Sequence, residues 1–177
     1  MEHEVFMRKA IELAIMAGKK GSDAFGAVLV HDGEVIETAE NTSTTEPGFG
    51  HAEYNLVIKS AQRFPESVLT ECTLYSSTIP CPRCTCAIIA AGIRRIVYSV
   101  SYASFAKLIP GEYSKLSCDE IVRRLERDVE VVGPILEEEG MRTFEYWGGD
   151  YRPLEELLEE ARWVREGLDI KKDGCRQ

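Results

Sequence analysis

Two short stretches constrain this chain more than any other part of it, His51-Ala52-Glu53 and Pro80-Cys81-Pro82-Arg83-Cys84. One histidine nitrogen and two cysteine sulfurs are donors that Zn²⁺ prefers. Three protein ligands would leave the fourth tetrahedral position open for a water, which is the arrangement of a catalytic zinc. Glu53 is two residues beyond the histidine and could reach that water without binding the metal. The two stretches therefore predict one zinc site with a proton-carrying carboxylate beside it.

Both stretches are expected at the N-terminal ends of helices. Apolar residues recur at helical spacing over residues 51–64, and residues 82–91 are apolar nearly all round, which is typical of a buried helix. Residues two apart do not share a helical face, so His51 and Glu53 can serve one site only if it lies off the end of the first helix. A helix N-terminus also lowers the pKa of a thiol, which favours ligation by cysteine. We therefore expect the two helix ends to meet at one metal.

The rest of the chain alternates between helices and strands. The Asp32-Gly33 pair predicts a hairpin turn, and Ser117 with Glu120 predicts a capping box that opens a helix. Residues 101–116 are read as a loop with aromatic side chains. Further helices are expected over residues 4–17, 133–146 and 153–166, and strands over residues 25–30, 34–39, 72–78, 95–100 and 129–132. This order predicts an α/β fold, a three-layer α/β/α sandwich around a five-stranded mixed sheet.

The charge balance favours a small substrate. The formal net charge is −9, and the basic residues occur as isolated pairs such as Lys19-Lys20 and Arg94-Arg95. Binding to a nucleic-acid backbone needs a basic stripe, so we expect no nucleic-acid partner. No run approaches the ~18 apolar residues that span a bilayer. Glu2 and Glu4 stand where a secretory signal would be positive, so we expect a cytoplasmic protein without membrane attachment.

The six cysteines do not suggest a disulfide framework. Cys81 and Cys84 have metal-ligand spacing, and nothing else indicates an oxidising compartment. The other four, Cys72, Cys86, Cys118 and Cys175, are expected to be free thiols. Cys86 could offer a third sulfur to the metal, but we favour a buried small side chain there.

At these residues the chain resembles the cytidine-deaminase-like superfamily, most of all the branch that holds guanine deaminase, tRNA adenosine deaminase and fungal cytosine deaminase. The resemblance runs from about residue 5 to residue 132. It rests on FGAVLV followed by Asp-Gly, on Asn41 ahead of His-Ala-Glu, and on TLYSSTIPCPRC and AIIAAGIRRIVY. It implies that His51, Cys81 and Cys84 bind Zn²⁺, and that Glu53 takes a proton from the zinc-bound water and passes it to the ring nitrogen and the leaving amine.

The resemblance also implies substrate-binding roles. Asn41 matches a substrate-binding asparagine, and Phe25 matches the position that stacks on the base in guanine deaminases. The chemistry agrees with this set of residues. Replacing a ring amine by oxygen needs a hydroxide near pH 7, which zinc supplies, and a carboxylate that protonates the leaving group. Backbone groups around Ala52 and Cys81 could hold the ring and the developing charge.

The implied function is zinc-dependent hydrolytic deamination of a free nucleobase or nucleoside, with a purine of the guanine type slightly preferred. The alternatives are a tRNA adenosine deaminase, a cytosine deaminase, or a structural zinc domain with Cys86 as its fourth ligand. Neither purine group is matched fully. Residues 101–105 lack the acid that guanine deaminases carry there, and residues 46–50 read EPGFG rather than the Asp-Pro-x-Ala of the tRNA enzymes.

We expect one folded unit, with residues 1–150 as the deaminase domain and residues 151–177 as a C-terminal helix and tail packed on it. Tyr146, Trp147 and Tyr151 could close the pocket as a lid, although packing in the core or at a dimer interface is favoured for them. The resemblance implies a homodimer, because members of the superfamily usually pair.

Overall fold

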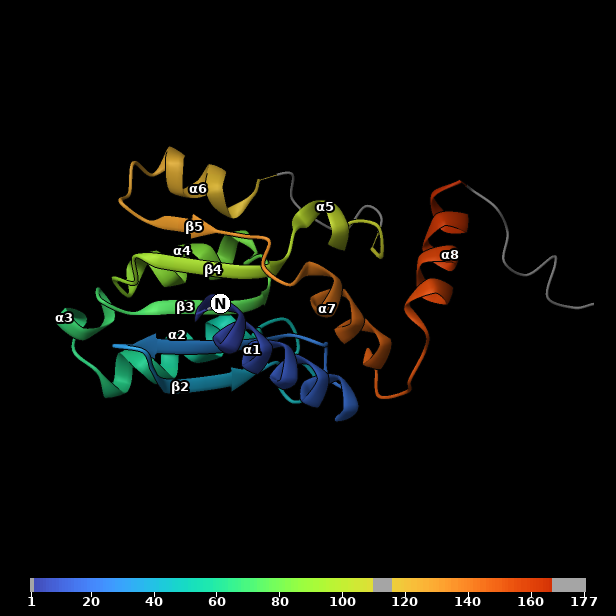
Figure 1. The fold of residues 1–177 in the computed structure, drawn as a ribbon, viewed down its shortest axis with the longest axis horizontal. Coiled ribbons are helices and arrows are strands. Elements are labelled where there is room, and N and C mark those ends of the chain that lie inside the picture. Colours follow the sequence, from blue (N-terminus) through green and yellow to red (C-terminus); the bar gives the residue numbers. More distant parts are fainter. Residues whose placement is uncertain (1, 110–115, 167–177) are drawn as a thin grey trace, which may run out of the picture.

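The computed structural model describes residues 2–109 and 116–166. Its centre is a five-stranded sheet in the order β2-β1-β3-β4-β5 (Figure 1). β1 pairs antiparallel with β2 and β3, whereas β3, β4 and β5 run parallel. The strand bounds are Gly26–His31 (β1), Glu34–Glu40 (β2), Thr73–Thr78 (β3), Arg95–Val100 (β4) and Glu130–Val132 (β5). The predicted five-stranded mixed sheet is confirmed.

The β1–β2 hairpin forms as its turn residues require. Asp32 and Gly33 both have positive φ, 49° and 76°, as the two-residue turn of a tight hairpin demands. Glycine has no steric penalty there, and aspartate tolerates the left-handed region better than most residues. The Asp-Gly signal therefore predicted this turn correctly.

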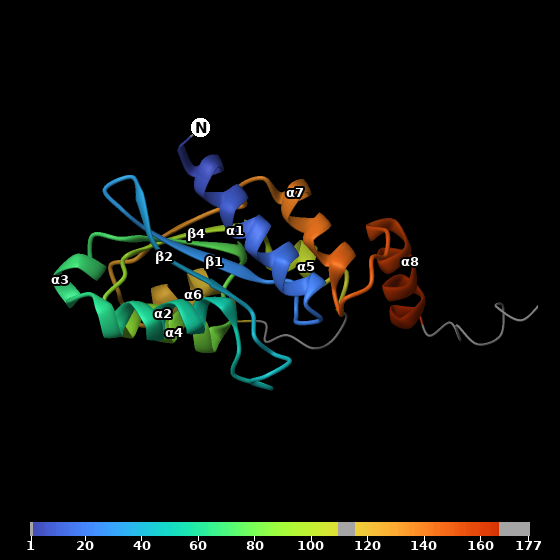
Figure 2. The ribbon, with the colours of Figure 1, turned by 90° about the horizontal axis from the view of Figure 1, so that it is seen from below.

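One face of the sheet is covered by α1 (Glu2–Lys19), with α7 (Glu137–Met141) and the short 3₁₀ helix η1 (Arg142–Tyr146) beside it (Figure 2). Phe6, Met7 and Ala10 of α1 belong to a buried cluster with Val28 and Val97 of the sheet. α1 approaches the sheet closely at Gly26, where a Cβ would lie 2.3 Å from the carbonyl oxygen of Ala10. This contact explains a glycine at the start of β1.

The opposite face is covered by α2 (Ala52–Arg63), α4 (Pro82–Ala90) and α6 (Cys118–Arg124), as Figure 2 shows. Leu56 of α2 and Ile88 of α4 are fully buried in a cluster with Leu29, Leu74 and Ile96 of the sheet. The two helical layers confirm the predicted α/β/α sandwich.

α4 departs from expectation because only one side of it is buried. Cys84, Thr85 and Ile88 face the core, whereas Cys86 and Ala90 are exposed. The prediction of a helix buried all round, with a buried Cys86, was therefore wrong. The run of small residues misled the assignment, since alanine and cysteine cost little free energy when a helix exposes them.

Three other segments differ from their predictions. The segment read as an aromatic loop contains a single helical turn, α5 (Tyr102–Phe105). The helix expected over residues 133–146 starts only at α7, after Gly133 and Leu136 with positive φ, and continues as η1. A short helix α3 (Glu66–Leu69) was not predicted.

The Ser117 half of the predicted capping box forms and caps α6, since the Ser117 side chain accepts from the Glu120 backbone N–H. The Glu120 carboxylate accepts from Arg124 instead. The C-terminal helix is α8 (Leu154–Arg165), close to the predicted range, and its partly buried leucines 154, 157 and 158 pack against the main core cluster. Cys175 and the tail from residue 167 onward lie outside the described residues. Within the described part of the chain, no helix is long and apolar enough to cross a membrane.

Candidate active site

The two sequence stretches meet at the N-terminal ends of α2 and α4. His51 is the N-cap of α2 and Cys81 is the N-cap of α4, both in extended conformation, and Cys84 lies in the first turn of α4. His51 Nδ1 is 3.6 Å from the sulfur of Cys81 and 3.6 Å from the sulfur of Cys84. All three potential ligand atoms lie within 4.8 Å of one another.

This geometry fits zinc. Tetrahedral coordination with Zn–S near 2.3 Å and Zn–N near 2.0 Å requires about 3.6 Å between the nitrogen and each sulfur. The observed separations match that value. Cys86, the alternative fourth ligand, is exposed and lies outside this group of three among the described residues.

The cluster concentrates negative charge on one sulfur. A hydrogen bond from the Cys84 thiol, with His51 alongside, lowers the pKa of Cys81 to about 4. The hydrogen bond between His51 and Cys81 raises the pKa of His51. The hydrogen bond between Cys84 and Cys81, together with burial, raises the pKa of Cys84. A thiolate at Cys81, with a second thiol and an imidazole beside it, suits a divalent cation.

Glu53 lies in the first turn of α2 and is 5% exposed. Burial raises the pKa of its carboxyl above the ordinary value, so it can carry a proton nearer to neutral pH. Ser76 Oγ lies 2.9 Å from Glu53 Oε1 and 2.6 Å from the carbonyl oxygen of Thr78. Ser76 was not singled out from the sequence; its position on β3, two residues after the core residue Leu74, was the available signal.

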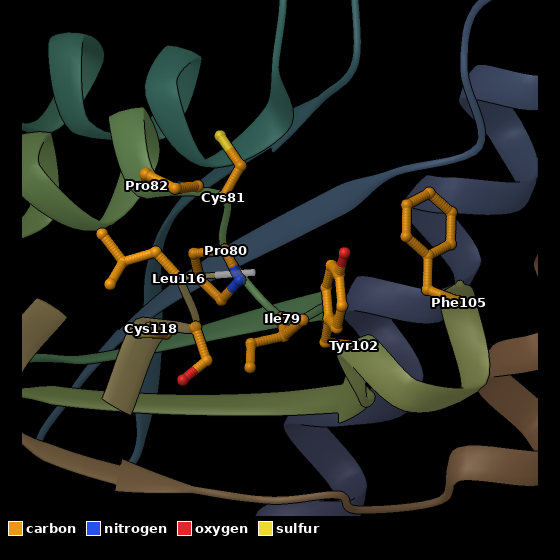
Figure 3. A pocket seen from close by; sticks show the side chains of 9 residues that line it. Ile79, Pro80, Cys81, Pro82, Tyr102, Phe105, Leu116 and Cys118 are labelled. Atoms are coloured by element: carbon orange, nitrogen blue, oxygen red, sulfur yellow. The ribbon is translucent and has the colours of Figure 1, made fainter. Parts of the chain in front are cut away.

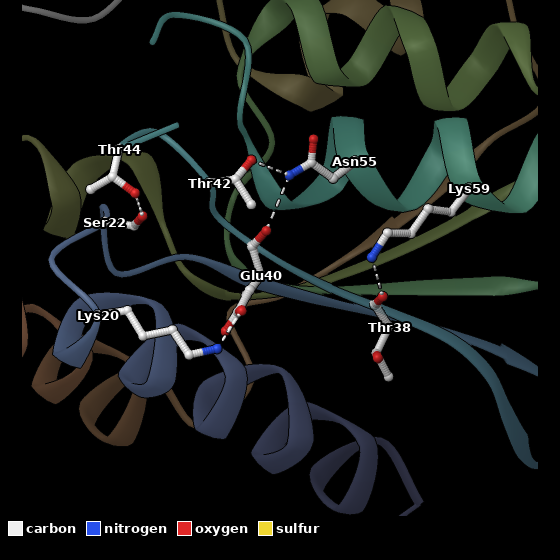
Figure 4. A network of polar contacts seen from close by, with 8 residues as sticks. All are labelled: Lys20, Ser22, Thr38, Glu40, Thr42, Thr44, Asn55 and Lys59. Atoms are coloured by element: carbon white, nitrogen blue, oxygen red, sulfur yellow. Dashed lines mark hydrogen bonds and ion pairs between the residues drawn. The ribbon is translucent and has the colours of Figure 1, made fainter. Parts of the chain in front are cut away.

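The loop before α2 is tied in place by hydrogen bonds. Asn55 Nδ2 of α2 donates to the Glu40 carbonyl at 3.1 Å and to Thr42 Oγ1 at 3.0 Å (Figure 4). Thr42 N–H donates to the carbonyl of Gly50, and a Cβ on Gly50 would lie 2.6 Å from the Thr42 carbonyl carbon. These contacts fix the residue that precedes His51.

Arg83, between the two cysteines, holds the same loop from the other side. Its guanidinium lies over the rings of Phe49 and Tyr54, 5.4 and 5.6 Å from their centroids, and donates to the carbonyl of Gly48. The helix that carries the sulfurs is thereby joined to the loop that carries the histidine.

A small cavity lies beside the His51 and Glu53 side chains and opens to solvent; about 280 Å³ of space there, part of it open solvent, is free of protein atoms. Its lining consists of Phe25, His51, Glu53, Thr78, Ile79, Cys81 and Phe105. A second hollow, also open to solvent, shares Ile79, Cys81 and Phe105 with it and continues to Tyr102 and Cys118 (Figure 3). The space next to the metal-ligating group is thus narrow and has mostly apolar walls.

Aromatic rings form one end of this cavity. The Phe25 ring meets Phe105, Phe144 and Trp147 edge-on, with centroids 5.7 to 5.9 Å apart. Trp147 stacks on Phe105 and donates from Nε1 to Asp23 Oδ1 at 2.7 Å. Trp147 therefore packs behind the wall of the cavity, whereas Tyr146 and Tyr151 pack against each other. Phe105 was missed as a pocket residue because the helical turn that presents it was read as a loop.

The two remaining predicted residues lie close by. Asn41 follows β2 and is 2% exposed; its backbone N–H donates to the Phe25 carbonyl, and its Nδ2 has no partner among the described residues. Ala52 is fully buried between His51 and Glu53. Neither contributes to the lining of the 280 Å³ cavity, so their substrate roles stay predictions.

Comparison with known protein sequences independently indicates a zinc site in this part of the chain. Residues 1–100 match the family model for the cytidine and deoxycytidylate deaminase zinc-binding region. The chain is 33% identical over 152 residues to a probable cytosine deaminase of Schizosaccharomyces pombe, covering 81% of this chain and 91% of the relative. It is 34% identical over 109 residues to the guanine deaminase of Bacillus subtilis, covering 60% and 70%.

A solved structure of a deaminase is also similar to this chain. A structure from work on A-to-I editing by tRNA:A34 deaminases superimposes with a TM-score of 0.62 at 26% identity, covering 78% of this chain and 98% of that one. Residues 1–100, which the family model matches, contain both helix ends and the three potential ligands His51, Cys81 and Cys84. This chain belongs to the cytidine and deoxycytidylate deaminase zinc-binding family and is a zinc-dependent hydrolytic deaminase.

Proposed function

We propose that the protein deaminates a free nucleobase or nucleoside, with His51, Cys81 and Cys84 as the zinc ligands and Glu53 as the proton carrier. The observation that carries the proposal is the shared cavity. The buried Glu53 carboxyl lines the same 280 Å³ space as His51 and Cys81, with aromatic and aliphatic walls around it. Apolar and aromatic walls beside a carboxyl and a potential metal site are the lining that a flat amino-bearing ring needs.

Each group has a defined part in the reaction. Bound zinc supplies a water whose pKa is lowered to about 7. Glu53 would accept a first proton from the attacking water and pass it to the ring nitrogen, and would then carry the second water proton to the leaving amine, which departs as ammonia. Ser76 holds the Glu53 carboxyl from the sheet side.

The substrate ring is held by groups around the cavity. Phe25 offers an aromatic wall, and the unpaired Asn41 Nδ2 is a donor held next to the Phe25 backbone. The backbone around Ala52, at the start of α2, would hold the ring or the developing charge.

A small ring is favoured over tRNA, and a purine of the guanine type is the first candidate to test. The net charge of −9 does not favour a long phosphate backbone. The purine preference rests on Phe25 and Asn41. Against it, Glu53 is the one carboxylate among the described lining residues of the cavity, so none is left to pair with a purine 2-amino group. Cytosine is therefore the closest competitor.

Ammonia release from the zinc-loaded protein tests this proposal. The panel contains guanine, guanosine, adenine, adenosine, cytosine, cytidine and an anticodon-loop RNA. We expect turnover of at least one base or nucleoside. Turnover of the RNA alone, or of nothing in the panel while zinc is bound, would contradict the proposal.

We also propose a homodimer formed through the outer face of α2 and α4. This face, defined by Phe49, Tyr54, Ile58, Arg83, Cys86 and Ala90, is largely apolar although much of it is exposed: Phe49 is 65% and Ile58 45% exposed. Residues three and four apart on a helix are neighbours, so Tyr54 and Ile58 adjoin on α2, and Arg83 and Cys86 adjoin on α4.

For the organisation of the chain, we propose that residues 1–150 form the deaminase domain and that residues 151–177 pack on it. The support is the contact of α8 with the main core cluster. The thiols of Cys72 and Cys118, free and buried, suit a reducing compartment, which favours a cytoplasmic protein.

A further inference from the structure

Thr78 is the last residue of the central strand β3 and pairs with Val100, the last residue of β4. The chain enters α4 a few residues later, at Pro82. It is 4% exposed and lines the 280 Å³ cavity together with His51 and Glu53. Side chains two apart on a strand point to the same face, so Thr78 shares the face of Ser76, whose hydroxyl contacts Glu53. The Thr78 side chain therefore faces the compartment that holds the Glu53 carboxyl.

The hydroxyl of Thr78 is buried without a hydrogen-bond partner among the described residues. The nearby hydroxyl of Ser76 is placed differently, 2.9 Å from the Glu53 carboxylate and 2.6 Å from the Thr78 carbonyl. An unpaired buried hydroxyl costs stability, and valine would fill the same space without that cost. Folding alone therefore does not account for a threonine at this position.

The other lining residues are either apolar or already assigned to the reaction. Phe25, Ile79 and Phe105 are apolar, His51 and Cys81 belong to the metal-ligating group, and Glu53 carries the proton. Thr78 is thus the uncharged hydrogen-bonding side chain that remains among the described residues of the lining. Apolar walls discriminate weakly between rings of similar shape, whereas a buried hydrogen-bonding group discriminates strongly.

We propose that Thr78 is a specificity-determining residue whose hydroxyl hydrogen-bonds a polar ring atom or oxo group on the edge of the amino-bearing ring. The inference rests on the proposed function and deepens it by naming a side chain that selects among bases. A ring with a polar atom at that edge would form a hydrogen bond with the Thr78 hydroxyl. A ring without one would leave the hydroxyl without a partner.

The test compares Thr78→Val with Thr78→Ser in the zinc-loaded full chain on the base and nucleoside panel. Thr78→Val should lower kcat/KM for the best substrate about tenfold or more, and Thr78→Ser, which keeps the hydroxyl, should stay within about threefold of wild type. The ratio of kcat/KM between the best and second-best substrates should also fall in Thr78→Val. Its thermal unfolding temperature should equal or exceed that of wild type, because the unpaired hydroxyl is gone.

The experiment distinguishes a failure of the Thr78 inference from a failure of the proposed function. If wild type turns over a base and Thr78→Val keeps its kcat/KM and its ranking of substrates, Thr78 has no selective role and the proposed function stands. A lowered unfolding temperature with an equal loss on every substrate would assign Thr78 a structural role instead. If the zinc-loaded wild type turns over no base or nucleoside, the proposed function fails and this inference fails with it.

Discussion

At the scale of single residues, Glu53 combines two properties that a proton carrier needs. It is buried, which raises the pKa of its carboxyl, and it is held by Ser76 at 2.9 Å in the cavity beside His51. A carboxyl that both accepts and donates protons in one cycle works best when its pKa is closer to the working pH than that of an exposed glutamate.

Glu53→Gln tests this role directly. Glutamine keeps the shape and can still contact Ser76, but it cannot accept and return a proton. We expect zinc to remain bound at one ion per chain and kcat to fall by at least about 10²-fold, the lower end of general acid–base contributions. Ammonia release and metal analysis on the same sample measure both. Wild-type kcat in this variant would remove Glu53 from the mechanism.

The proposed ligand role of Cys84 can be tested against a neighbouring cysteine that has the same chemistry. Cys84 is fully buried, with its sulfur 3.6 Å from His51 Nδ1, whereas Cys86 is exposed two residues away on the same helix. We expect Cys84→Ser to lose zinc and activity, since a hydroxyl is a much poorer zinc ligand than a thiolate. Metal content after dialysis measures this loss.

Cys86→Ser is the matched control and should keep both zinc and activity. Equal metal loss in the two variants would mean that Cys86 also ligates, contrary to its exposed position.

The sequence revealed the residues that bear recognisable chemistry, and missed those that act through position. His51, Glu53, Cys81 and Cys84 stand in a spacing that few other functions explain. Ser76 and Thr78 look like ordinary strand residues until their face of β3 is known, and Phe105 needed the turn of α5 to reach the cavity. The positions of these three side chains near Glu53 depend on contacts between distant segments, which local patterns do not encode.

At the scale of elements, strong local signals predicted structure well and weak ones did not. The Asp32-Gly33 turn and the Ser117 cap appear as predicted, because each is a self-contained local arrangement. The helix expected over residues 133–146 starts late, because residues 133–136 contact β4 instead: the Ile135 N–H donates to the Tyr98 carbonyl at 3.0 Å, and Ser99 Oγ donates to the Leu136 carbonyl at 3.1 Å. Tertiary pairing therefore overrode a helical pattern.

One contact between elements should depend on pH. Glu137, at the start of α7, accepts from the Ser101 backbone N–H at 2.9 Å and so holds the turn that leads into α5 and Phe105. Partial burial raises the pKa of Glu137, but hydrogen bonds from Ser101 and Ser104 lower it more, and the net pKa is below the ordinary 4.5. A depressed folded pKa stabilises the protein above pH 4.5, and this contribution is lost as pH falls through the folded value.

Glu137→Gln should therefore lower the unfolding temperature at pH 7 by about 2 °C, as expected for roughly 1 kcal/mol in a chain of this size. The difference from wild type should shrink as pH falls below 4.5, where the wild-type carboxylate becomes protonated. Thermal unfolding from pH 7 to pH 3 measures this, with the exposed neighbour Glu138→Gln as control. A difference that stays constant with pH would show that charge is not the cause.

At the scale of the whole molecule, both faces of the sandwich expose some apolar side chains, but only one of these surfaces lies beside the candidate site. α1 exposes Val5 and Met16 among charged residues such as Arg8, which is ion-paired to Glu139. The outer face of α2 and α4 instead exposes Ile58, Cys86 and Ala90, beside the loop that positions His51. A second copy seated there would shield this apolar surface and would also stabilise the loop held by Arg83.

Ile58→Glu tests this dimer. A glutamate at the centre of the proposed interface would bury an unpaired charge, so we expect the dimer seen for wild type in sedimentation or light scattering to become a monomer. The matched control is Val5→Glu, the same kind of substitution at a residue that is 57% exposed on α1, on the opposite side of the sheet. It should leave the dimer intact, because that surface lies away from the interface.

A wild-type protein that is monomeric at micromolar concentration, or an Ile58→Glu variant that remains dimeric, would exclude this face as the interface. If Ile58→Glu is monomeric and loses activity while zinc stays bound, the interface also supports the loop that carries His51.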